Sequence, residues 1–360
     1  MSRRVVLVPG IMGSTLELSG SAHVIWGEDL ADNYRTLIRN PGLLRWADNP
    51  ADARLMRFVD VGVDVPLTNW HLPFRKLDLW GRTIALLNAR PDVSEIIEFG
   101  YDWRAPLLDS ADKLASRVEA STGHDPTLAP PAKERRLVLI THSMGGIVGR
   151  ISIAHGLIHP LWIDRIVHIG TPLRGSPSAF RTAYERLSLP LFHEIFGLFR
   201  RKNRAGFERH LLDCIRTFPS LYHLFPPENV PYLYYSQSSR SNPLREKSMP
   251  AEHRRIAADC HAAIDRSQAI VASQAIKAYT VYTEVHAGRQ TELEFRVTPL
   301  ADGRGYTIDA VHATSDYGDG TVPSDSARGE PPVQGLNVVN VDHMTMCNNE
   351  RVVECIGALL

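Results

Sequence analysis

The sequence has few cysteines, no excess of charge and no long apolar run, and each of these absences excludes a class of protein. Its four cysteines in 360 residues form no C-x-x-C pair and are too few for a disulfide framework, a zinc ribbon or a thioredoxin site. Forty Lys and Arg balance forty Asp and Glu, which argues against nucleic acid as a partner, because a polyanion attracts an excess of positive charge. No apolar run approaches the roughly 20 residues of a membrane-spanning helix.

The N-terminal residues imitate a secretory signal, since two arginines precede the apolar residues Val5–Val8. The apolar run stops at Pro9 and Gly10, short of the roughly 7–15 residues that the apolar region of a signal peptide requires. We therefore interpret Val5–Val8 as a buried strand and expect the protein to be cytoplasmic.

Short apolar segments alternate with helical patterns, which predicts an α/β fold with a doubly wound, mostly parallel sheet and helices on both faces. Most of the strand candidates are apolar throughout, as expected for strands covered on both faces. They are Val5–Val8, Ile96–Tyr101, Leu137–Thr141, Ile166–Ile169, Ala278–Val285 and Leu336–Val341. The helical candidates are Leu77–Ala89, Pro106–Ala120, Gly145–His155, Ala251–Ile276 and Asn349–Leu359. An active site would lie at the carboxyl ends of the strands.

Two segments interrupt this alternation, residues 19–70 and residues 177–233. Neither has a clear period, and we expect both to be cap or lid insertions in a single domain that spans 1–360. The second contains the bulky apolar segment Leu187–Phe199, followed by a basic run. That segment is compatible with a lid helix that opens at an anionic lipid surface and equally with a fixed cap helix.

The most informative stretch is residues 137–146, which read LVLITHSMGG. A buried strand there leads into a tight turn centred on Ser143, and a helix follows, which is the context of a nucleophile elbow. Gly145 and Gly146 let strand and helix approach closely, although Thr141 stands where the first glycine of G-x-S-x-G usually lies. A serine in an ordinary strand-to-helix turn is the plain alternative, and the agreement of strand, turn and helix favours a nucleophile.

A catalytic serine needs a base to remove its proton and a carboxylate to orient that base. After an elbow of this kind the order along the chain is Ser, Asp or Glu, His. His343 is the one histidine in the last forty residues, and it directly follows the strand predicted at Leu336–Val341. We expect its neighbour Asp342 to point elsewhere, because adjacent residues of a strand face opposite ways.

Four aspartates compete for the role of the acid: Asp309, Asp316, Asp319 and Asp325. Asp319 stands between two glycines in YGDGTVP, residues 317–323, which allows a tight loop beyond the strand predicted at Ala278–Val285. Gly-Asp-Gly is also common in plain turns. Spacing alone leaves Asp319 and Asp316 nearly equal.

An oxyanion hole requires two main-chain N–H groups that point at the developing negative charge. One belongs to the residue after the nucleophile, Met144, and the other is expected from the loop after the first strand. That loop reads PGIMGS at residues 9–14, and Ile11 is the donor we expect. A glycine-rich turn without a ligand is the alternative.

Motifs of other chemistries are missing from the sequence. The segment HEIFG at 193–197 begins like the zinc motif H-E-x-x-H but ends in glycine, and neither G-x-x-x-x-G-K nor G-x-G-x-x-G occurs. Neither a metal nor a nucleotide is indicated, so we expect no cofactor.

Several motifs occur in an order that is typical of one known family. They are VPGIMGS at 8–14, YDWR at 101–104, HSMG at 142–145, FPS at 218–220 and GDGTVP at 318–323. In these motifs the chain resembles the lecithin:cholesterol acyltransferase family, which includes lysosomal phospholipase A2 and phospholipid:diacylglycerol acyltransferase, from about residue 5 to about residue 345. The segment GTPLRGS at 170–176 is also similar to one that follows the nucleophile helix in many bacterial lipases.

The resemblance implies an α/β-hydrolase fold that attacks acyl esters through a covalent acyl-serine, with Ser143 as nucleophile, Asp319 as acid and His343 as base. It also supports Ile11 and Met144 as oxyanion donors. Secreted members carry disulfides near the lid, and no cysteine of this chain precedes Cys214. Secretion and lipoprotein partners therefore do not carry over, and neither does the identity of the substrate, because the lid and membrane-binding regions show no residue-level match.

The block YDWR at 101–104 has two interpretations. It could line an acyl pocket, or Asp102 and Arg104 could form a structural brace that satisfies buried polar groups, and we favour the brace.

We therefore expect a serine carboxyl-ester hydrolase of lipase or phospholipase type, which acts on a lipid or another acyl ester and touches a membrane surface transiently. An acyltransferase that uses a lipid alcohol is the close alternative. A non-catalytic ligand sensor on the same fold is the alternative from another class, but such proteins usually lose a member of the triad. In a further alternative, residues 177–233 form a docking surface for a partner protein.

Overall fold

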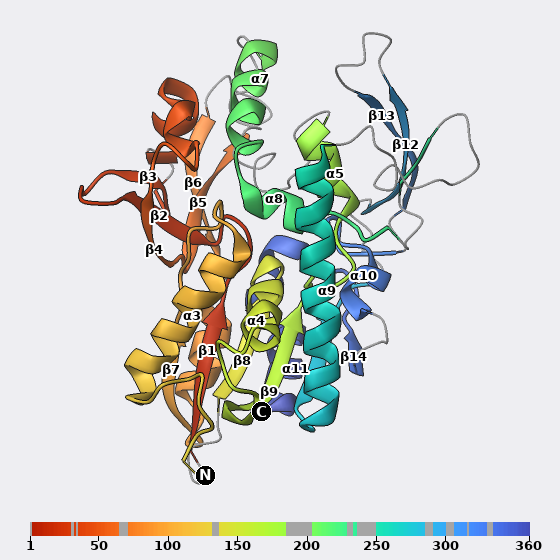
Figure 1. The fold of residues 1–360 in the computed structure, drawn as a ribbon. Coiled ribbons are helices and arrows are strands. Elements are labelled where there is room, and N and C mark those ends of the chain that lie inside the picture. The colour runs from red at the N-terminus through yellow and green to blue at the C-terminus, as the bar shows by residue number, and fades with distance from the viewer. Residues whose placement is uncertain are drawn as a thin grey trace.

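A six-stranded sheet in the order β14–β11–β9–β8–β1–β7 forms the centre of the molecule, and each paired strand runs parallel to its neighbour (Figure 1). The computed structural model describes residues 2–29, 32–33, 35–64, 71–131, 137–184, 204–228, 233–235, 250–284, 291–299, 306–314, 317–329 and 334–360. The strands of the central sheet are β1 (Arg3–Val8), β7 (Val93–Glu98), β8 (Leu137–His142), β9 (Ile163–Ile169), β11 (Lys277–Tyr282) and β14 (Gln334–Asn337). The last four residues of β1 and the first five of β8 are buried, so both faces of the sheet need a cover.

Helices provide this cover on both faces. On one face α3 (Leu107–Thr122), α4 (Met144–Ala154) and α9 (Ala251–Ser273) lie side by side, and α4 in the middle packs against both of the others (Figure 1). All residues of α4 are buried. On the opposite face α2 (Gly81–Asn88) packs against α11 (Glu350–Leu359).

The remaining elements lie outside this core. One small antiparallel sheet consists of β2 (Ser14–Leu18), β3 (Val24–Trp26) and β4 (Ala51–Leu55). An antiparallel ribbon consists of β5 (Phe58–Asp64) and β6 (His71–Asp78). A third small sheet joins β10 (Leu233–Tyr235), β12 (Thr291–Pro299) and β13 (Tyr306–Thr314). The shorter helices are η1 (Arg35–Arg39), η2 (Pro41–Leu44), η3 (Pro160–Trp162), α5 (Pro177–Tyr184), α7 (Arg204–Ile215), α8 (Pro219–His223), α10 (Ser324–Arg328) and η6 (His343–Asn348).

The structure confirms the central elements that the sequence predicts, but not all of their ends. The strand predicted at Leu336–Val341 ends at Asn337, because the chain turns at Asn340, whose φ is 57°. His343 therefore does not directly follow a strand, and that prediction is wrong. The helix predicted from Leu77 begins at Gly81, since residues up to Asp78 belong to β6.

The strands β2 to β6 and the β12–β13 hairpin were not predicted at all. The helix expected at Leu187–Phe199 lies outside the described residues, as does the HEIFG segment.

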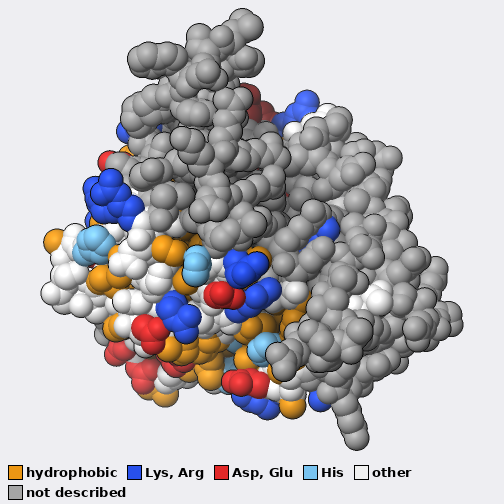
Figure 2. Space-filling model, turned by 90° about the horizontal axis from the view of Figure 1, so that it is seen from above, with side chains coloured by type: hydrophobic (Ala, Val, Ile, Leu, Met, Phe, Trp, Pro, Cys, Tyr) orange, Lys and Arg blue, Asp and Glu red, His pale blue; other side chains and the backbone are white. Residues whose placement is uncertain are grey.

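The carboxyl ends of the central strands point toward the upper end of the molecule in Figure 1, and Figure 2 looks down on that end. On the described part of this face, Lys and Arg side chains are interspersed with Asp, Glu and hydrophobic ones (Figure 2). Among the described residues, no helix combines the length and the apolar character that crossing a bilayer requires.

Candidate active site

Ser143 lies in the turn between β8 and α4, at a φ of 50° and a ψ of −127°. Side-chain-bearing residues rarely adopt a positive φ, so the backbone is strained here, as it is in a nucleophile elbow. A hydrogen bond and close packing hold the turn. The Ser143 N–H donates to the carbonyl of Ile169 at 2.9 Å. A Cβ at Gly145 would stand only 2.4 Å from the carbonyl oxygen of Pro9. Glycine is therefore required at position 145, as the sequence pattern predicted.

Three side chains that are far apart in the sequence meet at this turn. The Oγ of Ser143 lies 2.9 Å from Nε2 of His343, and Nδ1 of His343 lies 2.7 Å from Oδ2 of Asp319. Because a carboxylate only accepts hydrogen bonds, Nδ1 carries the proton of the neutral ring, and Nε2 is free to accept from the serine hydroxyl. The three residues are 6%, 4% and 2% exposed, in the order Ser143, His343, Asp319.

Asp319 is held by its own loop. Its Oδ1 accepts the main-chain N–H groups of Thr321 at 3.0 Å and Val322 at 2.8 Å, which leaves Oδ2 for the histidine. The main-chain N–H of His343 also donates to the carbonyl of Asp319 at 3.2 Å. The carboxylate is thus fixed in position before any substrate arrives.

The other acidic candidates lie elsewhere or outside the described residues. Asp325 is exposed and bonds to the hydroxyl of Tyr317. Asp342 caps η6, since its Oδ1 accepts the N–H of Met344 at 3.0 Å. Asp309 belongs to β13, and Asp316 lies outside the described residues. The carboxylate that meets the ring of His343 is that of Asp319, at Nδ1.

The two residues expected to form an oxyanion hole stand beside Ser143. Met144 is the first residue of α4, so its N–H has no acceptor within the helix. Ile11 lines the same small pocket as Ser143. Two aromatic side chains hold the loop that carries Ile11: Nε1 of Trp26 donates to the carbonyl of Met12 at 3.0 Å, and the hydroxyl of Tyr101 donates to that of Pro9 at 2.9 Å. This anchoring was not predicted from the sequence.

The pocket above Ser143 is narrow and mostly apolar. Its volume is about 30 Å³, which is room for about one or two water molecules. Its apolar lining includes Ile11, Met12, Leu224, Val322 and Met344, and Ser176 and Ser178 also line it.

His142, which precedes Ser143, also lines this pocket, although it was not predicted as a site residue. Its Nε2 lies 2.8 Å from the main-chain oxygen of His343, and the two rings are 4.9 Å apart between centroids. Burial, and secondarily the charge of His343, lower the pKa of His142 to about 3. The ring is therefore neutral at physiological pH.

The YDWR block forms a brace. Nη2 and Nε of Arg104 donate to the two carboxylate oxygens of Asp102 at 2.8 Å and 2.9 Å, and Arg104 also donates to the carbonyls of Leu44 and Asn49. The Arg104 side chain is fully buried, and neither residue lines the pocket above Ser143. These contacts confirm the brace interpretation.

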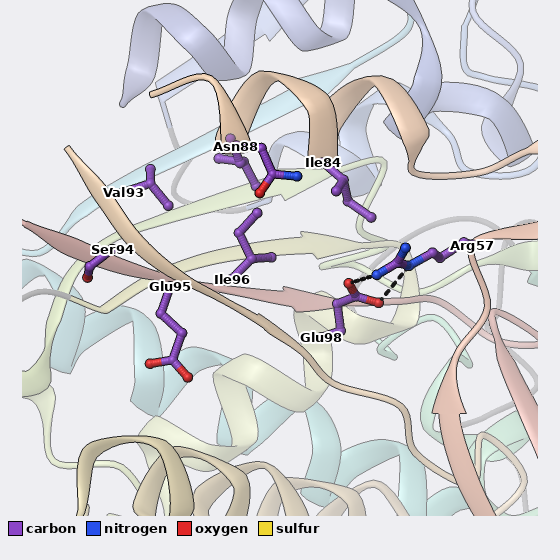
Figure 3. Close-up of a pocket in the computed structure, with 9 residues that line it drawn as sticks. Arg57, Ile84, Asn88, Val93, Ser94, Glu95, Ile96 and Glu98 are labelled. Atoms are coloured by element: carbon purple, nitrogen blue, oxygen red, sulfur yellow. Dashed lines mark hydrogen bonds and ion pairs between the residues drawn. The ribbon is translucent and has the colours of Figure 1, made fainter. Parts of the chain in front are cut away.

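A larger pocket of about 340 Å³ lies at the β7 edge of the sheet, between β7 and α2 (Figure 3). The Arg57 guanidinium bonds to the Glu98 carboxylate on one side of it (Figure 3). No histidine is among the described residues that line it, in contrast to the pocket beside Ser143. Within the described part of the chain, no group of three or more His, Cys, Asp or Glu side chains could hold a metal ion.

Comparisons with known proteins agree with this architecture. The model of a family described as the PGAP1-like alpha/beta domain matches residues 128–222, a segment that contains Ser143 but neither Asp319 nor His343. A protein of the yeast Saccharomyces cerevisiae, YJR098C, is 31% identical over 98 residues, which are 27% of this chain and 13% of the yeast protein. The chain therefore matches a small part of that protein's length.

Two solved structures cover almost the whole chain. A chain of the Tle4–Tli4 complex matches with a TM-score of 0.55 and 14% identity, over 99% of this chain and 98% of that one. The mature form of the Bacillus licheniformis lipase BlEst2 matches with a TM-score of 0.38 and 13% identity, over 99% and 91%. The chain has an α/β-hydrolase fold, and the fold predicted from the sequence is confirmed. The resemblance to the lecithin:cholesterol acyltransferase family stays a prediction.

Proposed function

We propose that this protein is a serine hydrolase that cleaves carboxylic esters, with Ser143 as nucleophile, His343 as base and Asp319 as the carboxylate that orients the base. The observation that carries the proposal is the continuous chain of hydrogen bonds from Asp319 through His343 to the Oγ of Ser143. Such a chain on a strained strand-to-helix turn is what a serine needs to become nucleophilic.

The reaction proceeds in two halves. The Oγ of Ser143 attacks the ester carbonyl while Nε2 of His343 takes its proton, and the N–H groups of Ile11 and Met144 bind the oxyanion. The C–O bond to the alcohol then breaks, and His343 gives the proton to the departing alcohol. A water molecule, deprotonated by His343, attacks the acyl-serine. The bond from the acyl carbon to Oγ then breaks, His343 returns the proton to Oγ of Ser143, and the acid leaves.

The apolar pocket favours an acyl ester with an apolar acyl chain, so a lipid or another acyl ester is the substrate class we propose. The lipase or phospholipase type and a transient contact with a membrane surface rest on the sequence resemblance, as does transfer of the acyl group to a lipid alcohol. The cytoplasmic location stays a prediction from the sequence.

Hydrolysis of p-nitrophenyl esters from short to long acyl chains tests the proposal. Ser143→Ala should abolish turnover, by roughly 10⁵- to 10⁶-fold, without loss of the fold. Ser94→Ala, a matched control on the exposed β7 edge, should retain it. Full activity of Ser143→Ala would refute the assignment.

Two further measurements on the wild type define the reaction. The optimum of acyl-chain length would separate lipase-like from small-ester enzymes. Product analysis with a lipid alcohol present would separate hydrolysis from acyl transfer.

A further inference from the structure

His142 joins the nucleophile's strand to the segment that carries His343. It is the last residue of β8, it lines the pocket beside Ser143, and its Nε2 lies 2.8 Å from the main-chain oxygen of His343. A carbonyl oxygen only accepts, so Nε2 must carry the proton and donate. The tautomer of His142 is therefore fixed as Nε2–H, with Nδ1 unprotonated.

This bond completes a set of four that fixes His343. The main-chain N–H of His343 donates to the carbonyl of Asp319, and its Nδ1 donates to the Asp319 carboxylate. Its Nε2 faces the Oγ of Ser143, and its main-chain carbonyl accepts from His142. Both the backbone and the ring of His343 are therefore tied to Asp319 on one side and to the end of β8 on the other.

His343 needs such ties because only a short helix holds it. It begins the six-residue 3-10 helix η6, and helices of this type are short and have poorer hydrogen-bond geometry than α-helices. The preceding strand β14 ends six residues earlier, at Asn337, and the chain between them turns at Asn340. The position of the His343 ring thus depends on individual hydrogen bonds.

We propose that His142 is a positioning residue for the reaction, which holds the main chain of His343 so that Nε2 of that ring faces the Oγ of Ser143. This inference rests on the proposed hydrolase function. During the reaction His343 becomes an imidazolium, and a second cation 4.9 Å away between ring centroids would oppose that charge. A neutral donor is therefore suited to the position, whereas Lys or Arg is not.

The test compares His142→Gln with His142→Met, whose side chains have similar length but differ in their ability to donate a hydrogen bond. We expect kcat of the Met variant to fall roughly 10- to 100-fold with KM little changed, since a displacement of about 1 Å can reduce a rate about 10²-fold. The Gln variant should recover most of the rate. Thermal unfolding verifies that both variants are folded, and if the Met variant fails to fold, His142→Phe, which keeps a ring against His343, takes its place.

The matched control is His223→Phe, because His223 also donates to a main-chain carbonyl, that of Pro219 at 2.9 Å, but is not among the described residues that line the pocket beside Ser143. It should leave kcat close to that of the wild type. A non-donor variant at position 142 with wild-type kcat would overturn the inference, and so would a Gln variant as slow as the Met variant, because the hydrogen bond would then not be the cause. Ser143→Ala, measured in parallel, separates the two claims: if it keeps its activity, the proposed function itself is wrong, and if it is inactive, only the role of His142 is in question.

Discussion

The two halves of the candidate site are held in place in different ways. The framework half, Ser143 between β8 and α4, stands on a buried central strand and on a helix whose residues are all buried. The loop half, Asp319 and His343, stands on a loop and on a single short 3-10 helix. In the framework half the sheet and its helices fix the proposed nucleophile, whereas in the loop half single hydrogen bonds fix the proposed acid and base. Changes in the two halves should therefore have different consequences.

Apart from the loss of Ser143 itself, the largest effect is expected in the loop half, from Asp319→Asn. The amide can still accept from Thr321 and Val322 through its oxygen, so the loop should keep its shape, but its NH₂ group would face Nδ1 of His343 and favour the wrong tautomer. We expect kcat to fall about 10⁴-fold, with little change in the melting temperature. Steady-state kinetics and thermal unfolding measure the two quantities.

Asp325→Asn is the control for this prediction, because Asp325 is exposed and bonds to Tyr317 rather than to His343. It should keep the wild-type kcat. If Asp319→Asn retained more than a tenth of the activity, the orienting role of Asp319 would have to be abandoned.

In the framework half, one methyl group added at Gly145 should lower stability. A Cβ at Gly145 would lie 2.4 Å from the carbonyl oxygen of Pro9 and 2.5 Å from that of Val8, and neither backbone atom can move cheaply. We expect Gly145→Ala to lower the free energy of unfolding by up to about 3 kcal/mol through overpacking, as measured by chemical denaturation.

Gly149 on the same helix provides the matched control. A Cβ there would meet side-chain atoms of Leu139 and Thr141 at 3.7 Å, an ordinary contact distance. Gly149→Ala should be neutral or should stabilise the protein by up to about 1 kcal/mol, because alanine favours the helix. Equal destabilisation by both substitutions would show that the close approach at the elbow is not the cause.

Acid should weaken the framework half by a similar amount at most. His261 of α9, the helix that packs against α4, is buried, and its Nε2 donates to the carbonyl of Phe225 at 2.7 Å. Burial lowers the pKa of His261 to about 4, whereas the unfolded chain takes up that proton below about pH 6.5. The unfolded state therefore binds more protons between these values, and stability should decrease as the pH falls from about 6.5 to 4, by at most about 3 kcal/mol from this residue.

Denaturation midpoints measured between pH 7 and pH 4 check this prediction. His261→Gln should make the dependence on pH shallower, and the exposed His155→Gln should leave it unchanged. A slope that His261→Gln does not reduce would mean that other groups cause the loss of stability in acid.

The same contrast explains how much could be predicted from the sequence. The framework half follows from local patterns: apolar runs predicted β1, β8 and β9, and the glycines after Ser143 predicted the tight turn. The sequence singled out His343, but on the wrong premise that a strand ended directly before it. Spacing alone could not separate Asp319 from Asp316, because that choice depends on how the loop directs its N–H groups; only the family resemblance pointed to Asp319.

Two other features left little trace in the sequence. The strands β2 to β6 are antiparallel and include few continuous apolar runs, so residues 19–70 showed no period. The contact between His142 and His343 joins positions 201 residues apart, and no local pattern encodes it. Features that depend on regular elements were thus predictable, while features that depend on single long-range hydrogen bonds were not.

The most direct test of the central claim is to treat the folded protein with a fluorophosphonate probe and to locate the adduct by peptide mass spectrometry. The account predicts one adduct, on Ser143, that forms in the wild type and is lost in Ser143→Ala. An adduct on another serine, or no reaction of well-folded wild-type protein even with detergent or anionic vesicles present, would contradict it and would favour a ligand-binding protein on the same fold.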